Sequence, residues 1–159
     1  MNRKILQAFA GLAAVLMMAD TANAQRRNEV GGRGVNKAQV KVVVKRVEDR
    51  VDNFAKNFDK SLDRSLLNGT SREDWLNKRA SDLESATDEL AREFDRRDTW
   101  VENKDEVRRC LNIATDIDRN MKNYRYGGPT EANWARVRFE LNTLADVYNL
   151  AKVGANVYK

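Results

Sequence analysis

Glycine and proline are so sparse in this chain that long, uninterrupted helices are the main choice left to its backbone. The residues of these two types beyond position 34 are Gly69, Gly127, Gly128, Pro129 and Gly154. Glycine interrupts a helix through its flexibility, and proline does so through its missing amide donor. The segments 35–68 and 70–126 contain neither residue, so we expect long helices joined by turns at Gly69 and at Gly127–Pro129.

Apolar residues repeat at the spacing of an α-helix in four successive segments. In each segment they recur every three or four residues and mark a single face, while the other faces are largely charged. The four expected apolar faces run from Val40 to Ser65, from Leu76 to Phe94, from Val107 to Tyr124 and from Trp134 to Ala151. The alternation typical of a β-strand extends nowhere beyond a few residues. The sequence therefore predicts an all-α protein built from four amphipathic helices.

Two of the helix starts are marked by capping residues. Thr70-Ser71 is followed by Glu73, which is the pattern of a capping box. In a capping box, side-chain oxygens accept hydrogen bonds from the unpaired backbone amides of the first helical turn. Pro129 opens the last segment, and proline is favoured in the first helical turn because its missing N–H would be unpaired there anyway. We therefore expect the second helix to begin at Thr70-Ser71 and the fourth at Pro129.

The boundary between the second and third helices carries no glycine and is inferred from the apolar repeat. Continuing the second apolar face leads to Arg97 and Lys104, so the phase of the repeat changes before Val107. A turn within residues 96–103 explains this change, and a single bent helix is the alternative. With short links throughout, the four helices would form an up-down-up-down bundle over residues 35–159.

The sequence also contains a hint of an internal repeat. Residues 58–79 align with residues 117–138 at a constant shift, which places Trp75 on Trp134 and Arg79 on Arg138. Two similar helical hairpins would stack into the expected bundle. Gene duplication and the general resemblance of any two amphipathic hairpins both explain the match, and the sequence leaves the choice open.

Residues 1–24 have the three parts of a bacterial-type signal peptide. Arg3 and Lys4 form a positive start, and the apolar stretch over residues 5–19 is short for a membrane span. The ending Ala22-Asn23-Ala24 fits the small-x-small rule and places cleavage after Ala24. We therefore expect the mature protein to be periplasmic or secreted, and an uncleaved membrane anchor is the alternative.

Basic residues gather near the start of the expected mature chain. Residues 25–34 combine three arginines with three glycines and are expected to form a flexible basic tail. Lysines then recur every fourth position on the first expected helix. The candidate anion-binding residues are Arg26, Arg27, Arg33, Lys37, Lys41 and Lys45. They would contact an anionic polymer or a membrane surface, whereas the ordinary alternative is a solvated face balanced by neighbouring helices. No aromatic residue lies among the lysines, which disfavours nucleic acid.

Two counts exclude most catalytic chemistry. The chain has no histidine and one cysteine. These counts rule out Ser-His-Asp and Cys-His catalysis, histidine-ligated haem and a disulfide within the chain. Asp116–Asn120 resembles the start of a calcium loop, but Met121 and Gly127 stand where that loop needs glycine and glutamate. We therefore expect a protein that is not an enzyme and that has no cofactor or metal.

Cys110 lies between Val107 and Ala114 on the third apolar face. This position predicts a small core residue. The alternative is an interchain disulfide, because export would place the thiol in an oxidising compartment.

Tryptophan residues fall near three of the expected helix starts, and tyrosines flank the second glycine turn. Trp75, Trp100 and Trp134 are expected to close the ends of the core while their N–H groups stay near water. The alternative is a ligand or partner surface at the end of the bundle. Trp75 and Tyr126 are the candidate residues for that surface.

The segment Trp134–Tyr148 resembles a closing motif of uncharacterised exported helical proteins of bacteria, and Glu106–Leu111 is similar as well. The resemblance covers the C-terminal third, and its pattern is little more specific than an amphipathic helix. It implies export and a helical fold and carries no function.

Together these observations predict an exported, non-catalytic helical bundle. We expect it to act as a protein-binding or structural module of the cell envelope or extracellular space, with a protein partner or a second copy of itself. The alternative is a binder of anionic polymer or membrane surface through the basic tail and the first helix. The formal net charge of +5 permits an anionic partner without requiring one.

Overall fold

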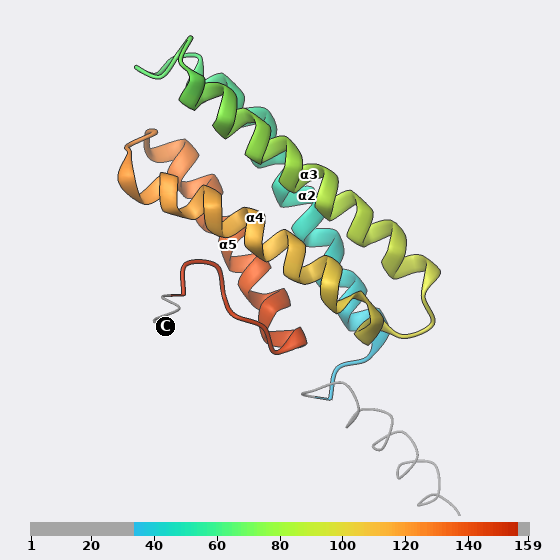
Figure 1. Cartoon of the computed structure of the whole chain (residues 1–159). Coiled ribbons are helices and arrows are strands. Elements are labelled where there is room, and N and C mark those ends of the chain that lie inside the picture. The colour runs from blue at the N-terminus through green and yellow to red at the C-terminus, as the bar shows by residue number, and fades with distance from the viewer. Residues whose placement is uncertain (1–33, 156–159) are drawn as a thin grey trace, which may run out of the picture.

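The computed structural model describes residues 34–155, so the predictions for the signal peptide and for Arg26, Arg27 and Arg33 lie outside the described residues. The described chain folds into α2 (Lys37–Leu62), α3 (Ser71–Arg96), the 3-10 helix η1 (Trp100–Asn103), α4 (Lys104–Asn123) and α5 (Gly128–Tyr148). Each long helix runs opposite to the one before it (Figure 1). The predicted all-α four-helix bundle is confirmed.

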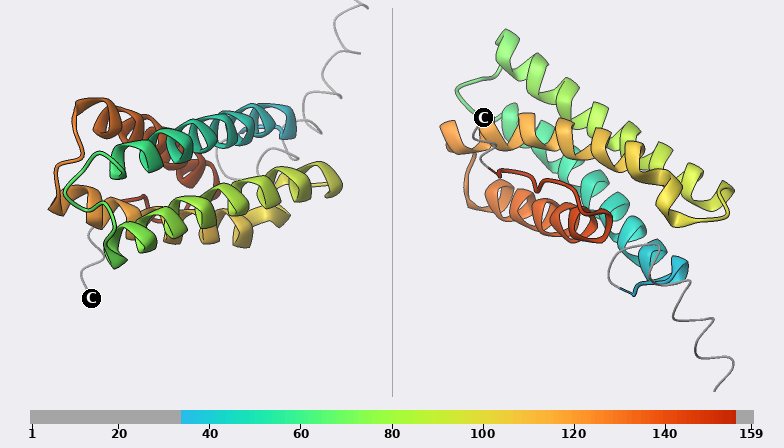
Figure 2. Two further views of the ribbon diagram at one scale, coloured as in Figure 1. Left: turned by 90° about the horizontal axis from the view of Figure 1, so that it is seen from above. Right: turned by 60° about the horizontal axis from the view of Figure 1, so that its bottom comes forward.

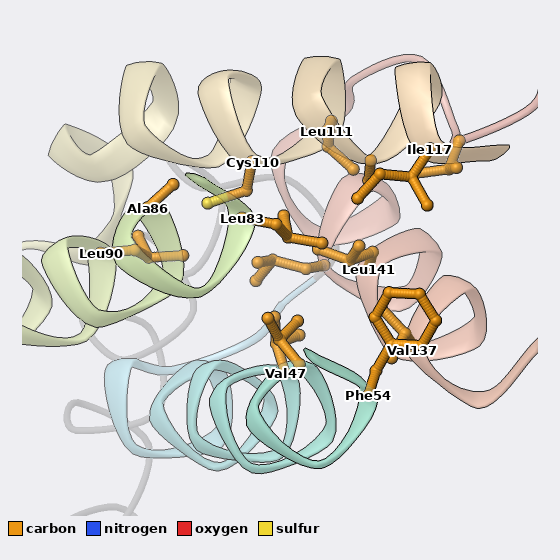
Figure 3. Packing of buried hydrophobic residues seen from close by; sticks show 14 of the residues in the cluster. Val47, Phe54, Leu83, Ala86, Leu90, Cys110, Leu111, Ile117, Val137 and Leu141 are labelled. Carbon is orange, nitrogen blue, oxygen red and sulfur yellow. The ribbon is translucent and has the colours of Figure 1, made fainter. Parts of the chain in front are cut away.

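The four long helices surround one apolar core. α2 packs between α3 and α5, and α4 packs against the same two helices on the other side (Figure 2). Buried side chains from all four helices meet in the interior, among them Val47, Leu83, Ile117 and Leu141 (Figure 3). Within residues 34–155, no helix is both long enough and apolar enough to cross a bilayer.

The predicted apolar faces are buried, with exceptions at their ends. Val43, which was predicted on the buried face, is half-buried, and its neighbour Val44 is buried instead. The buried face of α2 is wider than the predicted one because α2 packs against both α3 and α5. Tyr124 is exposed because α4 ends at Asn123 and the chain becomes extended. Ala151 is exposed because α5 ends at Tyr148, so the prediction that the fourth face reaches Ala151 is wrong.

The predicted helix boundaries are confirmed at each turn. Thr70 caps α3 by accepting the amide of Glu73, while the Glu73 carboxylate accepts the amide of Gly69 rather than that of Thr70. Pro129 lies in the first turn of α5. Residues 97–103 separate α3 from α4, so the alternative of a single bent helix is wrong.

One carboxylate is buried inside the α4–α5 hairpin. Asp118 accepts hydrogen bonds from Trp134 Nε1 at 3.0 Å and Arg138 Nη1 at 3.1 Å, and its other oxygen lies 2.8 Å from Lys122 Nζ. Burial alone would raise the pKa of Asp118, but the interactions with Lys122, Trp134 and Arg138 outweigh it and hold the pKa below its usual value. The segment that resembles a calcium loop therefore lies within a helix, with its central carboxylate already neutralised by protein cations.

The chain folds back after α5 and covers this carboxylate. Asn149 takes a left-handed conformation that ends the helix, and the red segment in Figure 1 returns along α5 toward the α4–α5 turn. Val153 is buried, and its amide donates to Asn142 Oδ1 at 2.8 Å. Gly154 has φ +78°, and a Cβ at this position would lie 2.7 Å from Asp118 Oδ2. Only glycine fits here without displacing the buried Asp118 or its partner Lys122.

The two hairpins that align in sequence bury different residues. Trp134 is 3% exposed, whereas Trp75 is 39% exposed, so the prediction that Trp75 closes the core is wrong. Asp118 is buried, while its counterpart Asp59 is exposed and accepts a hydrogen bond from Asn77. The aligned residues therefore have different surroundings in the two hairpins, and duplication stays a hypothesis.

The buried carboxylate predicts a pH-dependent contribution to stability. Asp118→Asn should lower the free energy of unfolding at neutral pH by about 2 kcal/mol, because Lys122 and Arg138 lose their anionic partner. A carboxyl whose pKa is lowered by folding stabilises the fold above its unfolded pKa of about 4 and loses this effect as the pH falls through the folded pKa. Urea unfolding of both proteins at neutral and acid pH should therefore show a difference that shrinks in acid. An equal difference at both values would contradict this role.

Gly154→Ala should destabilise the bundle more than Gly69→Ala. The two glycines have nearly the same φ, +78° and +75°, but open space surrounds Gly69. Placing alanine in this left-handed backbone conformation costs about 1 kcal/mol of stability in both variants. Displacing the Asp118–Lys122 pair should add about 1–3 kcal/mol at Gly154, as overpacking does elsewhere. Urea unfolding measures both, and equal losses would show that the C-terminal segment does not press on Asp118.

Candidate functional site

The α2–α3 and α4–α5 turns lie at the same end of the bundle (Figure 1). A hollow opens there, lined by residues of both turns. Its volume is about 990 Å³, and we call it the loop-end hollow. Its lining comes from the last turns of α2, the following turn, the α4–α5 turn and the start of α5: Asn57, Lys60, Ser61, Arg64, Ser65, Leu66, Leu67, Tyr124, Arg125, Tyr126, Pro129, Thr130 and Asn133.

The charge of this lining is entirely positive. Lys60, Arg64 and Arg125 line the loop-end hollow, and among residues 34–155 no aspartate or glutamate does. All three cations are exposed, and within the described part of the chain none of them forms an ion pair. The start of α5 also contributes Pro129 and Thr130, and a helix N-terminus carries partial positive charge. The hollow therefore attracts anions.

Two carboxylates near the hollow are held by backbone groups instead. Glu131 Oε1 accepts the amide of Tyr126 at 3.3 Å. Glu73 Oε2 accepts the amide of Gly69 at 2.6 Å, and Glu73 is buried. Within the described residues, neither carboxylate forms an ion pair with a cation of the lining.

Tyr126 forms the inner wall of the hollow. Its ring is buried and meets the ring of Phe58 edge-on, with 5.5 Å between the centroids. Its hydroxyl is buried, and within the described structure it has no hydrogen-bond partner. Burial raises the pKa of Tyr126 above its usual value, so the hydroxyl stays protonated and can donate. A buried donor without a partner costs free energy, and a ligand in the hollow reaches this hydroxyl only if the atoms that cover it move.

A short chain of hydroxyl groups fixes the two walls relative to each other. Thr130 Oγ1 donates to Ser61 Oγ at 2.8 Å, and Ser61 Oγ donates to the backbone oxygen of Tyr126 at 3.0 Å. These bonds connect α2 to the α4–α5 turn across the hollow. The two walls are therefore bonded to each other directly.

The lysines of the first helix, which sequence analysis proposed as anion-binding residues, are engaged in local contacts. Lys37 Nζ donates to the backbone oxygen of Arg97, Lys41 lies 2.7 Å from Asp95, and Lys45 lies 3.6 Å from Asp49. They lie toward the start of α2, at the opposite end from the loop-end hollow. This arrangement favours the interpretation of a solvated face balanced by its neighbours.

Trp75 and Tyr126, the candidate partner residues, lie in different environments. Trp75 is exposed on α3 beside Arg72 and Asn120, outside the loop-end hollow. Arg72 donates to Asn120 Oδ1, and its guanidinium lies over the ring of Tyr124, 4.6 Å from the centroid. Tyr126 is 7% exposed and lines the loop-end hollow, so the two candidate residues do not share one surface, and a partner surface built from them stays a prediction.

Cys110 lies in the core, facing Ala86 and Leu90 of α3 (Figure 3). Its thiol is free and fully buried. Burial raises the pKa of Cys110 to about 12, so almost no thiolate forms at neutral pH. A thiol in this position meets another chain only after the bundle opens, which argues against the interchain disulfide.

Sequence analysis did not identify Lys60, Arg64 and Arg125. About sixty residues separate Arg125 from the other two, and only the antiparallel packing of α2 and α5 brings them to one hollow. One weak pattern pointed to them: both glycine turns are preceded by an arginine within a few residues, Arg64 before Gly69 and Arg125 before Gly127.

Comparison of the chain with protein families, curated proteins and solved structures finds no match. The assignment of this site therefore rests on its own geometry. In the described part of the chain, no group of three or more cysteine, aspartate or glutamate side chains is placed to hold a metal ion. What the loop-end hollow offers chemically is a set of cations and hydrogen-bond donors.

Thiol labelling should be limited by opening of the bundle. A disulfide reagent such as DTNB should react with Cys110 only as fast as the core opens, because the reactive thiolate is both buried and suppressed. Mild denaturant should accelerate labelling. The protein should also migrate as the same species with and without reductant. Rapid labelling of the native protein, or a dimer that disappears on reduction, would contradict the buried position.

Proposed function

We propose that the protein is an exported, non-catalytic binding module that holds an anionic group of its ligand or partner in the loop-end hollow. The observation that carries this proposal is the lining, in which three cations and no carboxylate of the described residues face the hollow. Export is supported by the signal-peptide pattern of residues 1–24.

The lining provides several ways to hold an oxyanion. Arg64 and Arg125 carry planar guanidinium groups that bind a carboxylate or phosphate through two parallel hydrogen bonds, and Lys60 adds a point charge. Because the cations are exposed, each should contribute modestly, and affinity should come from several groups acting together.

A binding role is favoured over catalysis by what the chain contains. No histidine occurs in the sequence, so the most common general base at neutral pH is missing. The one cysteine is buried, with a raised pKa of about 12, and is a poor nucleophile. The hollow therefore offers recognition without a recognisable acid, base or nucleophile arranged for a reaction.

This proposal brings together the two expectations from the sequence. A protein partner or a second copy presents carboxylates, and an anionic polymer or membrane surface presents phosphates or carboxylates. Both would use the loop-end hollow, since the lysines at the start of α2 are engaged with other groups. The basic tail over residues 25–34 would add long-range attraction rather than the site itself.

Octyl phosphate, below its micelle concentration, is a suitable probe for isothermal titration calorimetry. We expect saturable one-to-one binding that weakens with added salt. Arg64→Gln and Arg125→Gln should each reduce the affinity about fivefold, the upper range for an exposed ion pair. Arg50→Gln and Arg136→Gln are matched controls, because both arginines are exposed on the helices away from the hollow. These two should leave the affinity unchanged.

Two results would refute the proposal. The first is equally tight binding of octyl glucoside, which has the same alkyl chain as octyl phosphate but an uncharged head. The other is an equal loss of affinity in the control variants, which would indicate general charge attraction rather than a site. Circular dichroism of each variant verifies that the helices are intact.

A further inference from the structure

The α2–α3 turn, residues 63–70, presents an apolar side chain at its tip. Leu66 is fully exposed, while its neighbour Leu67 is partly buried against the core. The turn is held by backbone bonds from Ser65 to Leu62 at 2.9 Å and from Thr70 to Leu67 at 2.9 Å. Ser65 Oγ also donates to the backbone oxygen of Leu62 and accepts the amide of Leu67. A well-bonded turn therefore holds Leu66 in water.

A single exposed leucine is ordinary on a protein surface, so its surroundings decide its meaning. Leu66 lines the same hollow as Lys60, Arg64 and Arg125. Tyr124, which is 41% exposed, lies on the same rim. The loop end thus combines an apolar tip, a partly exposed aromatic ring and three cations that form no ion pair with another described residue.

These groups match the chemistry of a membrane surface. Cations near an anionic bilayer are attracted to the lipid phosphates. Tyrosine side chains favour the level of the headgroups, and burial of an apolar side chain at the boundary of the acyl chains is favourable in free energy. A free phosphate ion would use the cations and leave Leu66 in water. Single-stranded nucleic acid needs free aromatic faces for stacking, and here Tyr126 is buried and Arg72 covers Tyr124.

We propose that the loop end docks the protein on an anionic phospholipid bilayer. Leu66 enters the acyl boundary, while Lys60, Arg64 and Arg125 bind the headgroup phosphates. This inference rests on the proposed function, because it names the source of the anionic group held in the loop-end hollow. The bundle then stands on its end, with the start of α2 directed away from the bilayer, since α2 begins at the opposite end (Figure 1).

Removing the charge of Asp63 should strengthen bilayer binding, whereas removing a cation of the hollow should weaken it. Asp63 is an exposed carboxylate of the same turn, adjacent to Arg64 and outside the lining of the hollow. At the C-terminal end of α2, where the helix dipole is negative, its charge does not stabilise the helix. Asp63→Asn should therefore strengthen binding to an anionic bilayer without harming the fold.

The experiment is cosedimentation of the whole protein with sucrose-loaded vesicles. One set contains one-third phosphatidylglycerol in phosphatidylcholine, and the other contains phosphatidylcholine alone. We expect binding to the anionic vesicles only, decreasing with salt. Leu66→Asp should weaken it about tenfold, each of Lys60→Gln, Arg64→Gln and Arg125→Gln about fivefold, and Asp63→Asn should strengthen it about fivefold.

Matched controls separate this site from the rest of the chain. Val42→Asp places the same charge at another exposed apolar residue, on the outer face of α2, and should leave vesicle binding little changed. Arg136→Gln removes a cation away from the hollow and should do the same. Each substituted side chain is exposed, so the variants should fold, and circular dichroism verifies this.

Three outcomes would overturn the docking proposal. Equal binding to neutral vesicles would remove the role of the phosphates, and full binding by Leu66→Asp would remove the role of the apolar tip. Binding of octyl phosphate or of an acidic peptide such as polyglutamate, with no binding to anionic vesicles, would exclude the bilayer and leave the loop-end hollow as a site for another anionic partner. Loss of octyl phosphate binding as well would refute the proposed function itself.

Discussion

Each helix of this protein carries one apolar face, and no helix can bury that face without the others. This requirement places α2, α3, α4 and α5 around a shared core and leaves their sides covered by charged residues. Many of those charges pair with neighbours, as Lys41 does with Asp95 and Arg46 with Glu140. Many charges on the sides of the bundle are thus balanced, whereas Lys60, Arg64 and Arg125 gather around one hollow at its end.

The buried carboxylate of Asp118 gives the second hairpin its register. A buried charge without partners is unfavourable in free energy. Asp118 therefore pairs with Lys122 of α4 and accepts hydrogen bonds from Trp134 and Arg138 of α5. Gly154 then covers the pair from the C-terminal segment. The cluster therefore joins α4, α5 and the C-terminal segment.

The fold was accessible from the sequence, whereas the site was not. Sparse glycine and the repeat of apolar residues determine helices and turns locally, and for this reason the cap at Thr70 and the turn after Arg96 were predicted correctly. The burial of Asp118 and the exposure of Trp75 depend on which helix packs opposite, information that periodicity does not contain. Lys60 and Arg125 belong to different hairpins, so their proximity emerges only from packing.

The most direct measurement is a two-dimensional NMR titration of the isotope-labelled protein with octyl phosphate, read residue by residue. If the loop-end hollow binds an anionic group, the largest shifts will occur over residues 60–67 and 124–130, including the arginine Nε–H signals of Arg64 and Arg125. Residues at the other end, around Lys41 and Asp95, will change little. Shifts concentrated on the basic tail or the start of α2, with residues 60–67 and 124–130 unchanged, would contradict the account.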